Sequence, residues 1–96
     1  MSNPTDGVVN NTEKFRFEVR SGALLSRLDY RLGRSTIALV HTEVPEELQG
    51  QGLGSSLIVT ALEYAREKEL TVLPYCPFAA AYVERHPEWQ DIVGEV

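Results

Sequence analysis

The segment Gln-Gly-Gln-Gly-Leu-Gly at residues 49–54 places three glycines at alternate positions. It follows the apolar run 35–44 and opens a long amphipathic segment, so it predicts a strand-to-helix junction. Glycine has no Cβ, and the first N–H groups of a helix are unpaired, so such a junction can bind an anion closely. A glycine-rich turn alone is as often a simple tight connection, so its function depends on the flanking chain.

Before this turn, apolar residues recur at about every second position, and after it they recur about every 3.6 residues. Strands are predicted for four runs with alternating or β-branched residues, at 15–20, 24–32, 35–44 and 71–75. The short turn at Ser21-Gly22 makes the first two strands antiparallel. The third run is more continuously apolar, which predicts a central strand covered on both faces. An amphipathic helix from Leu53 and a second helix from Pro77, ending at His86-Pro87, complete the order β-β-β-α-β-α. We therefore expect an α/β fold with a central mixed sheet, in which a right-handed crossover joins two parallel strands.

The size and composition of the chain predict one domain. With 96 residues, 43% of them hydrophobic, the chain can build one modest core. The polar residues 1–12 are predicted to be a disordered N-terminal leader, and residues 13–96 a single domain. No apolar run approaches the roughly 20 residues that span a bilayer, and the start lacks the apolar centre of a signal peptide. A lone cysteine allows no internal disulfide and no Cys-based zinc site, so we expect a soluble cytoplasmic protein without a metal or a membrane partner.

The net charge of −5 is unevenly distributed along the chain. Residues 1–34 hold six basic and four acidic groups, a balance of +2, whereas residues 35–96 hold three basic and ten acidic groups, a balance of −7. An acidic chain without a basic stripe argues against nucleic acid as a partner, because that binding depends largely on neutralising phosphates. The acidic balance suits an amine substrate, although solubility alone also accounts for it.

Two common nucleotide-binding motifs do not fit the glycine turn. A Walker A loop requires a lysine and then Ser/Thr after its last glycine, but Ser55-Ser56 follow Gly54 directly. The dinucleotide fingerprint requires a different glycine spacing in the first strand-helix unit of a larger sheet. The segment does match Gln/Arg-x-x-Gly-x-Gly/Ala, through Gln49, Gly52 and Gly54. In this it resembles the pyrophosphate loop of the GNAT acetyltransferase superfamily.

The resemblance extends over nearly the whole predicted domain, from Phe15 to Trp89. The run 41–45, His-Thr-Glu-Val-Pro, precedes the loop, and the segments 75–78, Tyr-Cys-Pro-Phe, and 86–89, His-Pro-Glu-Trp, follow it. Together they look like the small single-domain, YjdJ-like branch of the superfamily. Larger members carry one or two helices between the first and second strands, which form a wall of the acceptor site. The turn at Ser21-Gly22 leaves no room for such helices.

The resemblance implies an N-acetyltransferase that binds acetyl-CoA, with coenzyme A held at the helix start and its pantetheine arm along the strand edge near residues 42–44. Backbone N–H groups of residues 51–55 would converge on the pyrophosphate, and Ser55 and Ser56 would either add hydroxyl donors or face solvent. Gln49 would either contact the ligand or brace the turn. The predicted cofactor-binding residues are Thr42, Val44, Gln49, Gly50, Gln51, Gly52, Leu53, Gly54, Ser55, Ser56, Pro77 and Phe78.

The catalytic candidates are His41, Cys76 and Glu43, which lie near the ends of the two predicted parallel strands. In direct transfer, His41 would deprotonate an amine that attacks the thioester. In double displacement, Cys76, at a helix N-terminus that favours a thiolate, would first take the acetyl group. Glu43 shares a strand face with His41 and is either a rival base or the group that orients the imidazole. Tyr82 is a weaker candidate acid for the departing thiolate. The first three candidates also have ordinary structural interpretations. His41 can be a hydrogen-bonded core histidine, Cys76 a small buried thiol and Glu43 a solvated carboxylate.

The sequence is compatible with two other functions. The first is a non-catalytic module or sensor that holds CoA or an acyl-CoA, and the second is an interaction domain without a cofactor. We expect acetyl-CoA and an unidentified amine, a small molecule or a protein, as the partners, and a monomer or weak dimer as the assembly.

Overall fold

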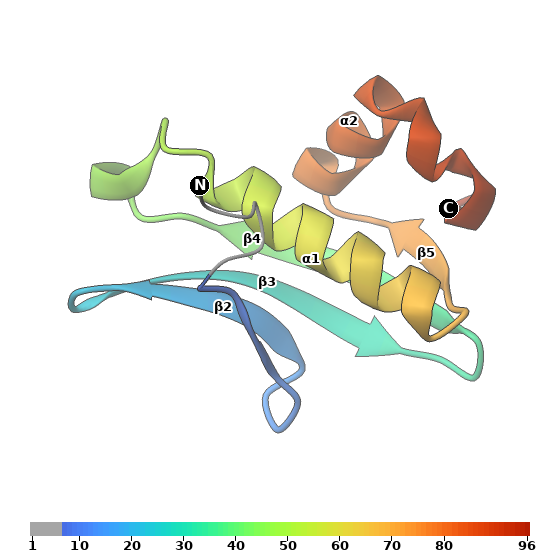
Figure 1. Ribbon diagram of the computed structural model, residues 1–96, viewed down its shortest axis with the longest axis horizontal. Coiled ribbons are helices and arrows are strands. Elements are labelled where there is room, and N and C mark those ends of the chain that lie inside the picture. The colour runs from blue at the N-terminus through green and yellow to red at the C-terminus, as the bar shows by residue number, and fades with distance from the viewer. Residues whose placement is uncertain (1–6) are drawn as a thin grey trace.

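The computed structural model describes residues 7–96, and it contains one five-stranded mixed sheet (Figure 1). The strands are β1 (Val9–Asn11), β2 (Arg16–Ser21), β3 (Leu24–Leu32), β4 (Thr36–Glu43) and β5 (Thr71–Pro74). They lie in the order β1-β2-β3-β4-β5, antiparallel from β1 to β4 and parallel between β4 and β5. The predicted mixed sheet with a parallel β4–β5 pair is thus confirmed.

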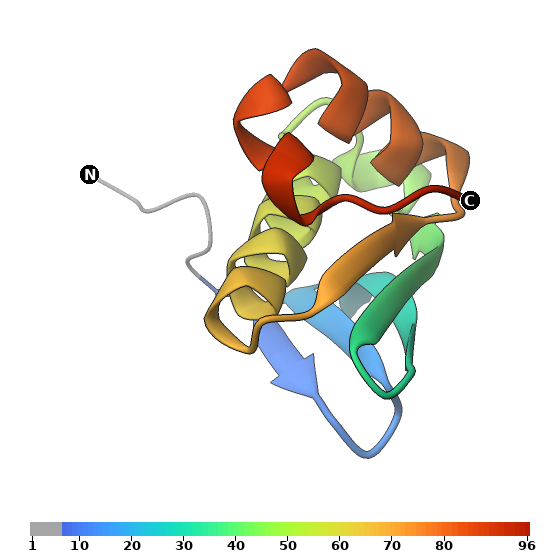
Figure 2. The same ribbon diagram turned by 90° about the vertical axis from the view of Figure 1, so that its right-hand side faces the viewer.

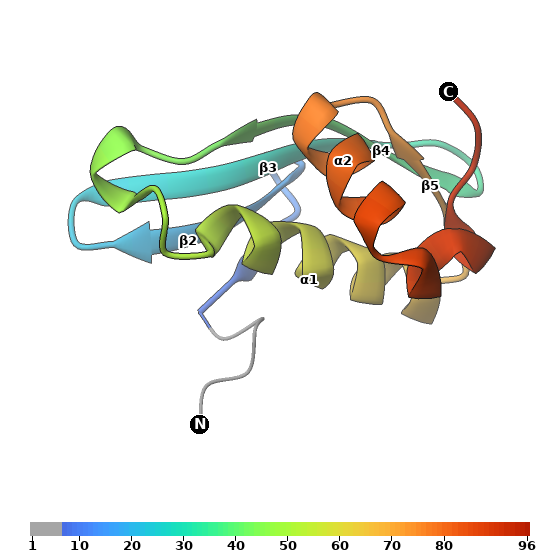
Figure 3. The same ribbon diagram turned by 90° about the horizontal axis from the view of Figure 1, so that it is seen from above.

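Two helices pack on the same face of this sheet. Helix α1 (Leu53–Glu67) connects β4 to β5, and α2 (Pro77–Arg85) follows β5 and packs against the start of α1 (Figures 2 and 3). Short 3-10 helices, η1 (Glu46–Leu48) and η2 (Pro87–Ile92), precede α1 and follow α2. The apolar stripe of α1 is fully buried against the sheet, through Leu57, Ile58, Ala61, Leu62 and Ala65. This one-sided packing leaves the opposite face of the sheet open.

The prediction that the third strand is covered on both faces is wrong. In β4, Ile37 and Leu39 are fully buried under the helices, whereas Thr36, Ala38 and Val40 on the other face are partly exposed. A continuous apolar run is typical of a strand covered twice, but Ala and β-branched residues are also tolerated on an open face. The open face is therefore available for contacts outside the core.

The boundary of the predicted leader is also corrected, because residues 9–11 form β1 within the sheet. Asn10 pairs with Phe17 of β2, and its side-chain oxygen accepts a hydrogen bond of 2.7 Å from the hydroxyl of Tyr30. Residues 1–6 of the leader lie outside the described part of the chain. With β1 in place, residues 12–15 connect the first two strands, and Gly22-Ala23 connects the second and third. A strand of three residues is too short to show the period-two pattern by which strands are predicted from sequence.

A β-bulge interrupts the pairing of β3 with β4. Asp29 pairs with His41 and the next residue, Tyr30, pairs with Leu39, so that Val40 has no partner on β3. The extra residue reverses the alternation of side chains along the rest of β4. This reversal determines which functional residues of β4 face the helices.

Candidate functional site

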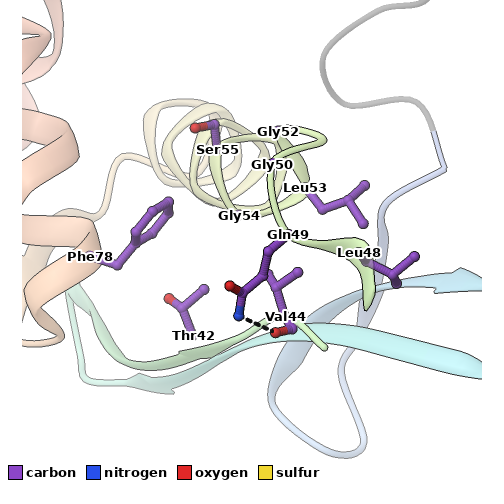
Figure 4. Close-up of a pocket in the computed structure, with 10 residues that line it drawn as sticks. All are labelled: Thr42, Val44, Leu48, Gln49, Gly50, Gly52, Leu53, Gly54, Ser55 and Phe78. Carbon is purple, nitrogen blue, oxygen red and sulfur yellow. Dashed lines mark hydrogen bonds between the residues drawn. The ribbon is translucent and has the colours of Figure 1, made fainter. Parts of the chain in front are cut away.

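A pocket of about 430 Å³ lies between the end of β4 and the start of α1 (Figure 4). The end of β4 and the loop before α1 form two of its sides, and the ring of Phe78 from α2 stands at a third. Its lining residues are Thr42, Val44, Leu48, Gln49, Gly50, Gly52, Leu53, Gly54, Ser55 and Phe78. The glycine turn and the helix start therefore open onto one cavity.

The turn has a backbone conformation that requires glycine. Gly50 and Gly52 have φ angles of 85° and 79°, in the left-handed region that other residues rarely adopt. Gly52 is the N-cap of α1 and supplies no side-chain cap. The first intrahelical bond is donated by the N–H of Ser56 to Gly52 O at 3.0 Å, so the preceding helical N–H groups have no intrahelical acceptor. Unpaired N–H groups at the positive end of the helix dipole form a binding site for an anion.

Gln49 braces this turn against the sheet. Its side-chain Nε2 donates a hydrogen bond of 3.3 Å to the carbonyl oxygen of Val44, which joins the loop to the end of β4 (Figure 4). Leu48 lines the pocket although the sequence did not single it out. The pattern that would have indicated it is one apolar residue in the otherwise polar loop before the glycines.

Gly54 is required for a different reason from that of Gly52, namely the close approach of α2. A Cβ at Gly54 would lie 2.8 Å from Cζ of Phe78, a distance that normal packing does not allow. The absence of a side chain thus lets the aromatic ring close the pocket against the helix start.

Three predicted cofactor-binding residues do not line the pocket. Gln51 is exposed beside it, and Pro77 is exposed in the first turn of α2. The hydroxyl of Ser56 donates to the carbonyl oxygen of Gly52 at 3.1 Å, so it serves the helix turn, whereas Ser55 does line the pocket. The remaining predicted residues all contribute to the lining.

The pairing of β4 with β5 ends beside this pocket. The last paired residues are Leu39 and Pro74, and one further bond runs from Cys76 N to Leu39 O at 2.9 Å. Strand β4 continues to Glu43, beyond the end of β5. Beyond this bond, no backbone hydrogen bond joins residues 40–43 to residues 75–76, and we call this unpaired stretch the β4–β5 split. A backbone edge of this kind can pair with an extended ligand.

Cys76 lies on the helix side of the split and is 5% exposed. Its Sγ accepts a hydrogen bond of 3.4 Å from the N–H of Ala79, which makes it the N-cap of α2. The same sulfur lies 3.4 Å from Oγ1 of Thr42, a pocket-lining side chain. Thr42 faces the helices because of the bulge, and it separates the thiol from the pocket.

His41 and Glu43 lie on the opposite, open side of β4. Both side chains are more than half exposed, and His41 Nε2 is 3.5 Å from Oε1 of Glu43. The other oxygen of Glu43 accepts a hydrogen bond of 2.9 Å from Arg27. The hydrogen bond with His41 and the ion pair with Arg27 lower the pKa of the Glu43 carboxyl. Glu43 is thus a poor base at neutral pH and is suited to orienting the imidazole.

Tyr82 is engaged with His86 and not with the pocket. Its ring stacks on the imidazole with centroids 3.9 Å apart, and burial raises the pKa of its hydroxyl. His86 Nδ1 donates to the carbonyl oxygen of Tyr82 at 2.8 Å. Both contacts lie at the C-terminal end of α2.

Residues 7–96, which the structure describes, contain no helix long and apolar enough to cross a membrane. In the same range, no three side chains of the metal-ligating acidic, histidine or cysteine types gather at one place.

In this domain, the pairing of two sheet strands ends beside the glycine-rich start of a helix. Such a site can hold a ligand that carries a phosphate group and an extended arm. The comparisons with known proteins identify the family. The family model described as GCN5-related N-acetyl-transferase matches residues 14–92, so the chain belongs to that family.

The individual relatives agree with this assignment. Protein NATD1 of Xenopus tropicalis is 29% identical over 83 residues, which cover 83% of this chain and 76% of that protein, and the Mus musculus protein matches to the same extent. Human protein NATD1 is 32% identical over 56 residues, which cover 58% of this chain and 50% of that protein. An NMR structure of a GCN5-like protein from Staphylococcus aureus superposes with a TM-score of 0.75 at 29% identity, covering 100% of this chain and 93% of that one.

Proposed function

We propose that this chain is an acetyl-CoA-dependent N-acetyltransferase that acts on an amine. The observation that carries the proposal is the pocket at the glycine turn, where the unpaired N–H groups of α1 meet the end of β4. The pyrophosphate of acetyl-CoA would be held by these N–H groups, and the pantetheine arm would run along β4 past Thr42 into the β4–β5 split. This path would begin in the pocket that Val44, Ser55 and Phe78 line.

The chemistry would take place at the split, which has different groups on its two sides. The thioester would arrive from the helix side, and the amine would approach from the open side, where His41 is positioned. In direct transfer, His41 takes a proton from the amine, the nitrogen bonds to the carbonyl carbon, and the carbon–sulfur bond to CoA breaks. The CoA thiolate leaves and is then protonated. Glu43, with its lowered pKa, would hold the imidazole in orientation.

Release of free CoA tests this function. The chain is mixed with acetyl-CoA and with each of a panel of amines, and free thiol is measured against a blank without amine. We expect release above the blank with at least one amine, together with one acetylated product per CoA. Binding of acetyl-CoA without release for any amine would instead favour the alternative function, a non-catalytic CoA or acyl-CoA module. Lack of any thermal shift with CoA would contradict both.

The second route, through an acetyl group on Cys76, makes a separate prediction. The contacts of Cys76 are those of a helix cap, so Cys76→Ser, whose hydroxyl can still accept from Ala79, should keep acetyl transfer within about an order of magnitude. Cys76→Ala should lose about 1 kcal/mol of stability with the cap, again without losing transfer. Urea unfolding and CoA-release rates measure the two effects.

A different set of results would establish the covalent route through Cys76. Loss of transfer in both Cys76 variants, with unchanged acetyl-CoA binding, would contradict direct attack. Intact-protein mass spectrometry after mixing with acetyl-CoA would then show an added acetyl group in the wild type and none in Cys76→Ser. The 3.4 Å contact between Cys76 and Thr42 places the sulfur close enough to the pocket wall for this test to be needed.

A further inference from the structure

The open face of the sheet carries a second pocket, outside the site described above. It has a volume of about 580 Å³, which is in the usual range for small-molecule sites, and lies where β2 begins beside β3 and β4. Its walls come from residues 14–16 at the start of β2, from residues 27 and 29–32 of β3 and from Val40 of β4. No helix covers this face of the sheet (Figure 2), and the pocket therefore opens to solvent.

The charge of this pocket is positive. Four of its lining side chains are cationic and one, Asp29, is acidic. Arg16 is paired with Glu18 at 2.6 Å, and Arg27 with Asp29 and Glu43. The other two cations, Lys14 and Arg31, form no ion pair within residues 7–96. These two unpaired cations of the more basic N-terminal part of the chain therefore face the same hollow, where an anionic group would complement them.

The pocket also has a rigid apolar wall. Phe15 lines it and is 52% exposed, whereas Leu32 pairs with the buried Ile37, so its side chain lies on the helix side of β3. Phe15 has a φ of 55°, which is rare for an aromatic residue, and its carbonyl oxygen accepts a hydrogen bond of 2.9 Å from Tyr30 N. Its ring also meets that of Tyr30 edge to face, with centroids 6.3 Å apart. A strained backbone that holds an exposed aromatic ring in place is a feature of ligand sites.

The position of Val40 connects this pocket to the β4–β5 split. Val40 lines the pocket, is the bulged residue of β4, and is the first residue after the last β4–β5 pair. A small molecule bound against Phe15 and Arg31 can therefore extend past Val40 to the open side of the split, beside His41. This side lies opposite the pocket at the glycine turn.

We infer that the acetyl acceptor is a small amine that also carries a carboxylate and an apolar body, and that the open-face pocket binds it. Arg31 and Lys14 hold the carboxylate, Phe15 contacts the apolar body, and the amine reaches the split past Val40. This inference rests on the proposed acetyltransferase function for the reaction itself, but not for binding. In the reaction the amine nitrogen forms the new bond to the acetyl carbon, its proton passes to His41, and CoA leaves as the thiolate.

The experiment compares two amines that differ only in the carboxylate, para-(aminomethyl)benzoate and benzylamine. Binding to the chain without acetyl-CoA is measured by calorimetry, and kcat/KM by CoA release. We expect para-(aminomethyl)benzoate to be preferred about tenfold in both measurements, because a charge-assisted hydrogen bond to a carboxylate is worth that much. Arg31→Gln should remove this preference, and Lys14→Gln should reduce it. The matched control is Arg34→Gln, an exposed arginine of the β3–β4 turn outside the pocket, which should leave the preference unchanged.

The outcomes separate this inference from the proposed function. Acetyl transfer without a preference for the carboxylate, or with a preference that Arg31→Gln does not alter, would overturn the inference and leave the acetyltransferase standing. Binding of para-(aminomethyl)benzoate that depends on Arg31, with no transfer to any amine, would support the site but overturn its role as an acceptor site. Equal loss in Arg31→Gln and Arg34→Gln would show only a general charge effect and would also overturn the inference.

Discussion

Gly52→Ala is expected to weaken acetyl-CoA binding by about 100-fold, because the loss of two charge-assisted hydrogen bonds to phosphate, each worth roughly 1.5 kcal/mol or more, has that effect. Gly52 is in the left-handed region at φ 79° and is the N-cap of α1. Alanine destabilises this conformation, so the turn shifts and the N–H groups that follow it lose their common direction. The added methyl itself would meet no protein atom within 4 Å, so the fold should tolerate it. Calorimetric titration with acetyl-CoA measures the change.

Gly22→Ala is the matched control for this variant. Gly22 has a φ of 62° in the turn between β2 and β3, and a Cβ there would also meet no atom within 4 Å. Both variants should lose a similar stability, about 1 kcal/mol, from the same backbone strain. Only Gly52→Ala should lose affinity. If the two variants bind acetyl-CoA equally well, the glycine turn does not hold the pyrophosphate.

The parts of the fold that were predictable are those with a long, uninterrupted pattern. The fifteen residues of α1 show a 3.6-residue period, and β5 follows through a crossover whose geometry allows only parallel pairing. The glycine turn was equally clear, because glycine spacing reports a backbone conformation directly. Most of the residues predicted to bind the cofactor line the pocket at the glycine turn, and their binding role stays a prediction.

The parts that were not predictable depend on interactions between distant residues. The bulge at Val40 arises from the pairing of β4 with β3, and nothing in the run 36–43 indicates an extra residue. Period-two alternation would place His41 on the same face as the buried Leu39, but the bulge places it on the open face. The proximity of Cys76 to Thr42, and not to His41, follows from the same reversal. Local pattern thus predicted which residues gather at the end of β4, but not the side of the sheet on which each lies.

The bulge also gives the two sides of β4 different roles at one place in the chain. Within four residues, Val40 lines the open-face pocket and Thr42 lines the pocket at the glycine turn. Two substrates could therefore approach the split from opposite faces without competing for the same surface. This arrangement requires no helix between the first strands, where residues 12–15 form a short turn and supply Lys14 and Phe15 to the open-face pocket.

His41→Gln is expected to lower kcat by about 100-fold, the lower end of the usual contribution of a general base. Glutamine can still hydrogen-bond Glu43 but cannot take up the proton of the amine. Because glutamine exchanges no proton at this position, the two proteins should differ in the pH dependence of kcat. The hydrogen bond with His41 and the ion pair with Arg27 lower the pKa of the Glu43 carboxyl, so Glu43 is ionised at neutral pH. The acceptor amine ionises identically in both proteins, so the difference between their pH profiles isolates His41.

Glu43→Gln and His86→Gln complete this test. Glu43→Gln removes the charge that orients His41 and should lower kcat by less than His41→Gln does, because the base itself remains. His86 is the other histidine of the chain, and it stacks on Tyr82 at the end of α2, so His86→Gln should leave kcat and the pH profile unchanged. Thermal unfolding of all three variants separates catalysis from stability. An unchanged kcat and pH profile in His41→Gln would mean that the base is not on the open side of β4, and the direct route through His41 would then be wrong.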